Sequence, residues 1–163
     1  MGKHLVVLQC LRIISGGQTG VDRGALDAAI AAGLSHAGSC PAGRLAEDGI
    51  IDARYQLTET PDSNPAVRTW SNVQNSDATL ILCPIKPEGG TLLTLNHAMA
   101  LSRPCLVVDS FDARTPAIIL DWLRSLDIET LNIAGPRESE CAGIQFRAQS
   151  LLETVFGAVA HQS

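Results

Sequence analysis

Residues 12–30, RIISGGQTGVDRGALDAAI, carry four glycines between an apolar beginning and an alanine-rich end. The apolar stretch 5–15 is rich in β-branched residues and predicts a strand that stops at Gly16. Apolar residues then recur at helical spacing from Val21, and Gly33 stands where a helix commonly ends. A strand that runs into a glycine-rich loop and then a helix leaves backbone N–H groups free at the helix N-terminus. This arrangement favours an anionic ligand.

Strands and helices alternate along the rest of the chain. Further strands are predicted at 78–85, 104–110 and 129–135, and further helices at 64–75, 89–102, 115–126 and 143–160. Asn64 followed by Pro65, and Thr115 followed by Pro116, predict helix starts. Residues 34–62 mix glycine, proline and charge, and predict a long loop with a weak strand near 54–58.

This alternation predicts parallel βαβ units with right-handed crossovers. We expect one α/β domain over residues 1–163, a three-layer Rossmann-like sandwich with a mostly parallel sheet.

Composition excludes several classes of partner. The 163 residues carry a net charge of −5, and the 12 basic residues are scattered, which argues against nucleic acid. No apolar run reaches the roughly 20 residues of a membrane span. Five cysteines without a C-x-x-C pair predict free thiols and a cytoplasmic protein, and four histidines without ligand spacing predict no metal site.

Three loops are expected at the carboxyl edge of the sheet, where ligands bind in such folds. They are Gly16-Gly17-Gln18-Thr19-Gly20, Glu88-Gly89-Gly90-Thr91 and Gly135-Pro136-Arg137-Glu138-Ser139. Glycine allows close approach to the main-chain N–H groups, and helix N-termini favour phosphate. Two such loops together with Arg137 predict a pocket for a phosphorylated ligand. The stretch fits neither the G-x-x-x-x-G-K-[ST] phosphate loop nor the G-x-G-x-x-G dinucleotide motif.

A purely structural interpretation of each loop stays open. The glycines could serve tight turns alone, and Thr19 with Asp22 has the spacing of a capping box. Thr91 could be an N-cap, and Arg137 with Glu138 a solvated pair. Asp22 would repel a phosphate but could bind a ribose hydroxyl or a heterocycle N–H.

The segments ISGGQTGVDRGALDAA, CPAGRLAEDG, SDATLIL, GGTLLTL and LNIAGPRESE closely resemble the molybdenum cofactor carrier-like family. That family is a circularly permuted branch of the nucleotide-sensing superfamily that includes LOG-type cytokinin-activating enzymes and the DNA-processing protein DprA. The resemblance covers nearly the whole chain from Arg12. It implies a Rossmann-like fold and a homo-oligomer, a dimer or tetramer. It also implies that the molybdenum cofactor, a pterin with a phosphate-bearing tail, is bound and handed on to a molybdoenzyme.

The resemblance also implies a set of ligand-binding residues. They are Gly16, Gly17, Gln18, Thr19, Gly20, Asp22, Arg23, Arg44, Asp48, Gly89, Gly90, Thr91, Gly135, Arg137, Glu138 and Ser139.

One comparison within the superfamily bears on catalysis. LOG-type hydrolases carry P-G-G-x-G-T-x-x-E, whose glutamate helps to cleave an N-glycosidic bond. Here the stretch reads P-E-G-G-T-L-L-T-L-N, in which Glu88 precedes the glycines and Asn96 stands beyond Thr91. Because an amide cannot act as an acid or base, we expect a pocket that holds its ligand rather than cuts it.

Three functions therefore compete. The preferred one is a carrier of a phosphorylated heterocycle, with the molybdenum cofactor as the named ligand. The second is a nucleotide hydrolase or transferase that uses Asp22, Asp48 or Glu138, and it predicts a carboxylate of raised pKa in the pocket. The third is a nucleotide sensor, which predicts an exposed apolar face for a partner or a second copy.

Overall fold

The computed structural model describes residues 10–160. Part of the first predicted strand, residues 5–9, lies outside this range, as do His4 and His161. The inward orientation expected for the Val159 side chain likewise lies outside what is described.

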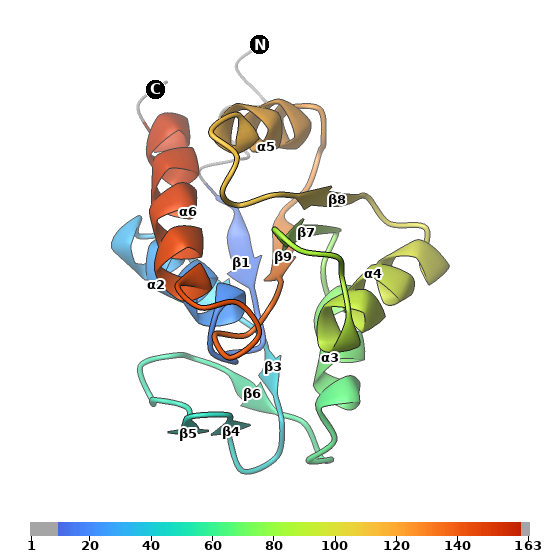
Figure 1. The fold of residues 1–163 in the computed structure, drawn as a ribbon. Coiled ribbons are helices and arrows are strands. Elements are labelled where there is room, and N and C mark those ends of the chain that lie inside the picture. Colours follow the sequence, from blue (N-terminus) through green and yellow to red (C-terminus); the bar gives the residue numbers. More distant parts are fainter. Residues whose placement is uncertain (1–9, 161–163) are drawn as a thin grey trace.

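The described chain forms an α/β fold in which five helices flank a five-stranded parallel sheet, as expected from the sequence (Figure 1). The sheet strands are β1 (Arg12–Ile14), β2 (His36–Ala37), β7 (Ala78–Leu82), β8 (Cys105–Val108) and β9 (Thr130–Ala134). The helices are α2 (Val21–Ala31), α3 (Pro65–Gln74), α4 (Gly89–Ala100), α5 (Thr115–Arg124) and α6 (Ile144–Ala160).

The strand order is β2-β1-β9-β7-β8, and all neighbouring pairs are parallel. From β1 the chain crosses through α2 to β2 at one edge, whereas from β7 it crosses through α4 to β8 at the other edge. The crossovers thus diverge from the middle of the sheet. In open α/β sheets this switch point is where ligands bind, outside the carboxyl ends of the strands.

Two helical layers cover the sheet. Helices α2, α5 and α6 pack together on one face, and α3 and α4 pack together on the other (Figure 1). Strand β7 is buried along its whole length, as expected of a continuous apolar run with helices on both faces. The Trp70 ring meets His97 edge-on at 4.7 Å between ring centroids and joins α3 to α4.

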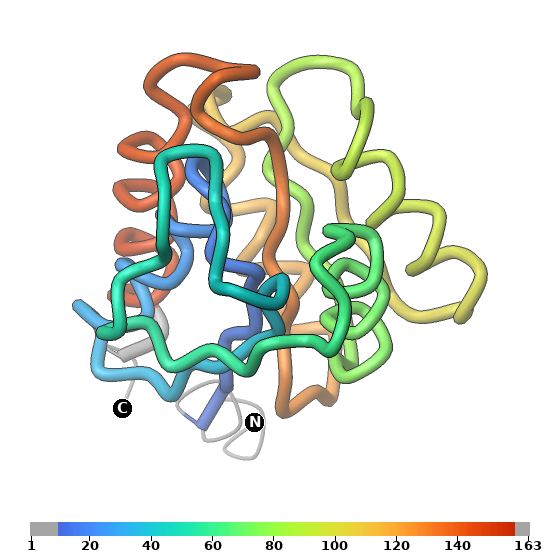
Figure 2. Tube along the Cα trace, turned by 90° about the horizontal axis from the view of Figure 1, so that it is seen from below, coloured from blue at the N-terminus to red at the C-terminus, as the bar shows by residue number. Residues whose placement is uncertain are grey.

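The segment 34–62 differs from its prediction. Instead of one weak strand near 54–58, it holds β2 and two small sheets. These are formed by β3 (Ser39–Cys40) with β6 (Thr58–Glu59), and by the hairpin of β4 (Leu45–Ala46) with β5 (Gly49–Ile50). A second small core beneath the hairpin contains Leu26, Cys40, Ile51 and Tyr55. Figure 2 looks onto the carboxyl edge and shows this segment crossing in front of it.

The helix starts are partly as predicted. The Asn64 side chain accepts a hydrogen bond from the Ala66 N–H and caps α3, as expected. The capping-box and N-cap alternatives for Thr19 and Thr91 are wrong, because Gly20 and Glu88 are the N-caps and neither caps through its side chain. Thr115 lies inside α5, and its hydroxyl donates to the Asp109 carbonyl at 2.5 Å.

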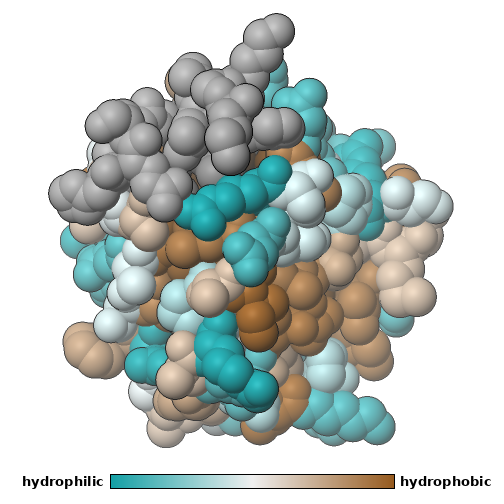
Figure 3. Space-filling view, turned by 90° about the horizontal axis from the view of Figure 1, so that it is seen from above, coloured by the Kyte–Doolittle hydropathy of each residue, from teal (hydrophilic) through white to brown (hydrophobic). Residues whose placement is uncertain are grey.

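One end of the molecule is partly apolar. Seen from the end where α5 lies, hydrophobic side chains gather beside polar ones (Figure 3). Ile118 of α5 and Val107 of the edge strand β8 are 43% and 39% exposed. In the part of the chain that the structure describes, no helix is both long and apolar enough to span a membrane.

Candidate functional site

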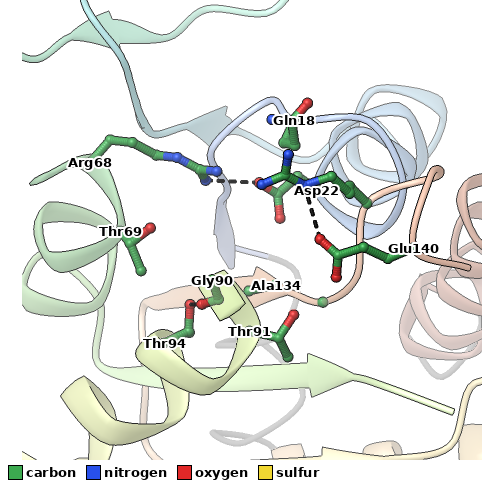
Figure 4. A pocket seen from close by; sticks show the side chains of 11 residues that line it. Gln18, Asp22, Arg68, Thr69, Gly90, Thr91, Thr94, Ala134 and Glu140 are labelled. Atoms are coloured by element: carbon green, nitrogen blue, oxygen red, sulfur yellow. Dashed lines mark hydrogen bonds and ion pairs between the residues drawn. The ribbon is translucent and has the colours of Figure 1, made fainter. Parts of the chain in front are cut away.

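The loops after β1, β7 and β9 meet at the switch point and enclose a small polar pocket, which we call the central pocket (Figure 4). The loop after β9 lies close to β7, since a side chain at Gly135 would overlap the Leu82 carbonyl oxygen. The volume that water can occupy in the pocket is about 40 Å³, which suits one small anion. Its lining residues are Gln18, Asp22, Arg68, Thr69, Gly90, Thr91, Thr94, Ala134, Gly135, Arg137 and Glu140.

Asp22 and Arg68 form a buried ion pair at one wall of the central pocket. Arg68 comes from α3 and places its Nη1 3.0 Å from Asp22 Oδ2 (Figure 4). The two side chains are 15% and 7% exposed, respectively. Gly16 makes room for this pair, because a Cβ there would overlap the Arg68 guanidinium and lie 2.9 Å from Asp22 Oδ2.

Burial dominates the acidity of Asp22. Desolvation raises the pKa of this carboxyl, although the Arg68 charge and hydrogen bond oppose the rise. The charged form therefore depends strongly on Arg68. A buried carboxyl of raised pKa beside a pocket is also the feature that the hydrolase hypothesis predicts.

Arg137 forms a second, more exposed ion pair in the lining of the central pocket. Its Nε lies 2.9 Å from Glu140 Oε1, and its side chain is 41% exposed. The central pocket thus carries two arginines and two carboxylates in pairs. Its fixed charges balance, so the remaining attraction for an anion comes from backbone dipoles and from N–H groups.

The N-terminus of α4 supplies those N–H groups. The Thr91 and Leu92 N–H groups donate to the Glu88 carbonyl, whereas the N–H groups of Gly89 and Gly90 precede the first intrahelical donor. Gly90 has nothing within 4 Å of the place where a Cβ would stand. Helix α4 therefore presents free donors and open space to the pocket.

Thr94 follows Gly90 by one turn of α4 and also lines the central pocket. Its hydroxyl donates to the Gly90 carbonyl at 3.0 Å. Asn96, considered from the sequence, is exposed and does not line the central pocket. No carboxylate of α4 therefore faces this pocket, and its two acids come from α2 and from the loop before α6.

A larger open hollow adjoins the central pocket. Its volume is about 540 Å³, and we call it the outer hollow. It lies between the hairpin, the first loop and the loop before α6, and is lined by Thr19, Arg23, Glu47, Asp48, Glu138, Ser139 and Gln145.

Arg23 and Asp48 pair across this hollow, and Arg23 Nη2 also donates to the Gly17 carbonyl at 3.1 Å. The pairing with Arg23 lowers the pKa of Asp48. Glu138 accepts hydrogen bonds from the Gly143 N–H at 2.5 Å and the Gln145 N–H at 3.0 Å. These contacts order the loop that leads into α6.

The predicted binding residues fall into four groups. Gln18, Asp22, Gly90, Thr91, Gly135 and Arg137 line the central pocket, Thr19, Arg23, Asp48, Glu138 and Ser139 line the outer hollow, and Gly16 lies against the ion pair. Gly17, Gly20, Arg44 and Gly89 line neither space.

Arg44 instead holds its own segment together. Its guanidinium donates to the carbonyls of Ile51, Asp52, Tyr55 and Leu57. Gly17 and Gly20 adopt positive φ angles of 77° and 84° and shape the first loop.

Sequence reasoning missed Arg68, Thr69, Thr94, Ala134 and Glu140 of the central pocket, and Glu47 and Gln145 of the outer hollow. Glu47 precedes Asp48, which is among the predicted binding residues, and this position is a weak indication in the sequence that Glu47 lies at the site. Arg68 lies inside a helix that follows the long loop, and nothing in its local sequence indicates contact with Asp22. No cluster of three or more metal-ligating side chains occurs among the described residues.

Comparisons place the chain among known proteins. Residues 13–156 match the model of the circularly permutated YpsA SLOG family. The fold is also similar to a crystal structure of a "putative molybdenum carrier protein" from Syntrophus aciditrophicus SB, with 42% sequence identity and a TM-score of 0.85. That match covers 88% of this chain and 93% of the other. No curated protein matches the chain. The family model and the structural match cover the sheet, its helices and all three loops, so the chain belongs to the circularly permutated YpsA SLOG family.

Proposed function

We propose that this protein binds and carries a phosphorylated heterocycle at the carboxyl edge of its sheet, and that the ligand is the pterin phosphate of the molybdenum cofactor. The observation that carries the proposal is the open N-terminus of α4 at Gly90, facing a small polar pocket between two arginines. The similarity to a molybdenum carrier supports the choice of ligand.

The residues present fit the two ends of such a ligand. A single phosphate matches the central pocket in size, and backbone N–H groups at a helix N-terminus suit its charge. A pterin is much larger than the central pocket and matches the outer hollow, where carboxylate and amide oxygens could accept its N–H groups. The cofactor brings molybdenum already bound to its own sulfurs, so the protein needs no ligand set for the metal.

Individual roles follow from the contacts. The N–H group of Gly90 would bind a phosphate oxygen, and Arg137 would add a charged hydrogen bond. Asp22 would hold the Arg68 guanidinium in place at the wall of the pocket. Glu138 already accepts two backbone N–H groups, which leaves part of its acceptor capacity for the heterocycle. A carrier of this kind would pass its cargo to a molybdoenzyme.

Gly90→Ala tests the phosphate end of the site. The new methyl group would stand where the anion approaches, so the affinity for pterin phosphate or inorganic phosphate is expected to fall at least about tenfold, roughly 1.4 kcal/mol. Alanine is also the better helix former, by about 0.5–1 kcal/mol. The variant should therefore melt slightly higher while it binds more weakly, as measured by calorimetric titration and thermal unfolding.

Gly157→Ala is the matched control. Gly157 lies within α6, and a Cβ there meets nothing within 4 Å. It should gain similar stability without loss of affinity. Unchanged phosphate affinity in Gly90→Ala would remove the α4 N-terminus from the binding site.

A nucleotide hydrolase is the second candidate, and the raised pKa of Asp22 favours it. Incubation with purine and pyrimidine nucleoside monophosphates, followed by chromatography for free base, distinguishes the two functions. Release of base that is lost in Asp22→Asn would support hydrolysis, and binding without release would support the carrier.

We also propose that the chain forms a homo-oligomer through the apolar end that includes Val107 and Ile118. Both side chains are exposed, and β8 is the edge strand of the sheet. An uncovered apolar strand edge is a common site of association. Sedimentation of the wild-type protein and of Val107→Lys tests this, with a shift to monomer expected in the variant.

A further inference from the structure

The tip of the β4–β5 hairpin inserts a carboxylate between two of the ligand-binding loops. Glu47 accepts hydrogen bonds from the Thr19 hydroxyl, from the Ser139 N–H at 3.1 Å and from the Ser139 hydroxyl at 2.5 Å. Arg137 Nη1 lies 4.0 Å from its Oε2. Both carboxylate oxygens are therefore bound by donors that come from outside the hairpin.

This donor set is the kind that binds phosphate. It joins a backbone N–H, two hydroxyls and a guanidinium from loops that start after different strands. All four groups belong to residues expected from the sequence to contact the ligand: Thr19, Arg137 and Ser139. The hydrogen bonds from Ser139 and Thr19 also lower the pKa of Glu47, which keeps it anionic.

The hairpin is attached to the outer hollow mainly through polar contacts. Asp48 pairs with Arg23, and the Glu47 N–H donates to Gln18 Oε1 at 2.9 Å. Its apolar anchor is small, because Leu45 and Ile50 are 56% and 77% exposed and Ala46 alone of its strand residues packs against the second core. A segment held by polar contacts at the surface opens at a small cost in free energy.

We propose that Glu47 occupies an oxyanion subsite of the ligand, and that an anionic group of the ligand displaces it and releases the hairpin 45–50. Glu47 is thus an internal competitor, and the hairpin is a gate at the rim of the outer hollow that the ligand releases. The inference rests on the proposed function, because it assumes that the same loops bind a phosphorylated ligand.

Inorganic phosphate is the probe, used on the full chain at fixed ionic strength. In the wild-type protein, phosphate should increase hydrogen exchange at the amides of 44–51, the Glu47 amide among them. In Glu47→Gln these amides should exchange rapidly without phosphate. Phosphate should bind Glu47→Gln about tenfold more tightly than the wild-type protein. This is the change expected if the Glu47 carboxylate fills the subsite about nine-tenths of the time in the wild-type protein.

Removal of one negative charge near the site would itself strengthen phosphate binding, so a charge control is needed. Glu140→Gln removes a carboxylate that pairs with Arg137 but makes no contact with the hairpin in the described hydrogen bonds and ion pairs. It should tighten phosphate binding while the hairpin exchange rates stay at their wild-type values.

The results separate the gate from the binding site. The gate would be overturned if phosphate binds the wild-type protein without changing hydrogen exchange at 44–51, and if Glu47→Gln has the same exchange rates and phosphate affinity as Glu140→Gln. The binding function would then remain intact. Absence of phosphate binding in the wild-type protein and in both variants would overturn the proposed site and the gate with it.

Discussion

Gly20→Ala is expected to destabilise the protein by about 3–5 kcal/mol, a large part of the roughly 5–15 kcal/mol that stabilises an ordinary domain. Gly20 has φ 84° and ψ −134°, a conformation that is strained for any residue with a Cβ. The Cβ would also overlap the Pro136 carbonyl oxygen and lie 2.7 Å from the Arg137 Cα. The loops after β1 and β9 would have to separate, so ligand affinity should fall together with stability. Urea denaturation measures the first effect, and calorimetric titration the second.

Gly33→Ala separates backbone strain from loop contact. Gly33 has φ 70° at the end of α2, and a Cβ there meets nothing within 4 Å. Its substitution should cost only the strain, about 1–2 kcal/mol, without change in affinity. Equal losses of stability in the two variants would mean that the close packing of the two loops contributes nothing.

Arg68→Met should cost about 3–5 kcal/mol at neutral pH, because it leaves the Asp22 charge buried without its partner. The loss should depend on pH in a defined direction. Burial already raises the pKa of Asp22 in the folded protein, and removal of the opposing Arg68 raises it further. A group with a raised folded pKa loses stabilising free energy as the pH rises from its unfolded pKa through its folded one. The variant should therefore be closest to wild type near pH 4, the ordinary pKa of an aspartate, and should lose stability relative to wild type as the pH rises, as measured by urea denaturation at a series of pH values.

The double variant Arg68→Met with Asp22→Asn completes this test. Since the amide carries no charge, much of the lost stability should return and the pH dependence should disappear. Two results would contradict the view that the lost stability comes from the buried carboxylate. One is an Arg68→Met variant whose loss of stability does not change with pH, and the other is a double variant that is no more stable than Arg68→Met alone.

The sequence predicted those parts of the fold that are encoded locally. Strand β7 and helix α3 have strong signals, one a continuous apolar run and the other an Asn-Pro start, and both lie where they were expected. The alternation of strands and helices placed the three loops at the carboxyl edge of the sheet, but the strand order that makes the crossovers diverge at its middle was not predicted.

The segment 34–62 was not predictable in the same way. Its strands have two residues each and show no periodicity, and β2 exists because its residues pair with Ile13 and Ile14 of β1. Arg68 and Glu47 were missed for a related reason. Each reaches its partner from a distant part of the chain, Asp22 in one case and Ser139 in the other, and no local pattern marks such a contact.

The helix starts at the site show how glycine misleads sequence reasoning. Thr19 and Thr91 have the residue type and spacing of N-caps, but the helices begin at other residues. The Thr19 hydroxyl instead binds Glu47 and accepts from the Glu138 N–H at 3.2 Å. Each threonine has a glycine beside it, Gly20 and Gly90, and such a residue lets the backbone turn so that the helix begins without a threonine cap.

Native mass spectrometry under anaerobic conditions tests the central claim most directly. The protein is purified from cells that make the molybdenum cofactor, and its bound material is released and analysed for pterin, phosphate and molybdenum. The account predicts a pterin phosphate at close to one per chain in the wild-type protein and a clear loss of it in Gly90→Ala. The account would be contradicted if the wild-type protein carries no phosphorylated heterocycle as purified and still carries none after anaerobic incubation with free cofactor.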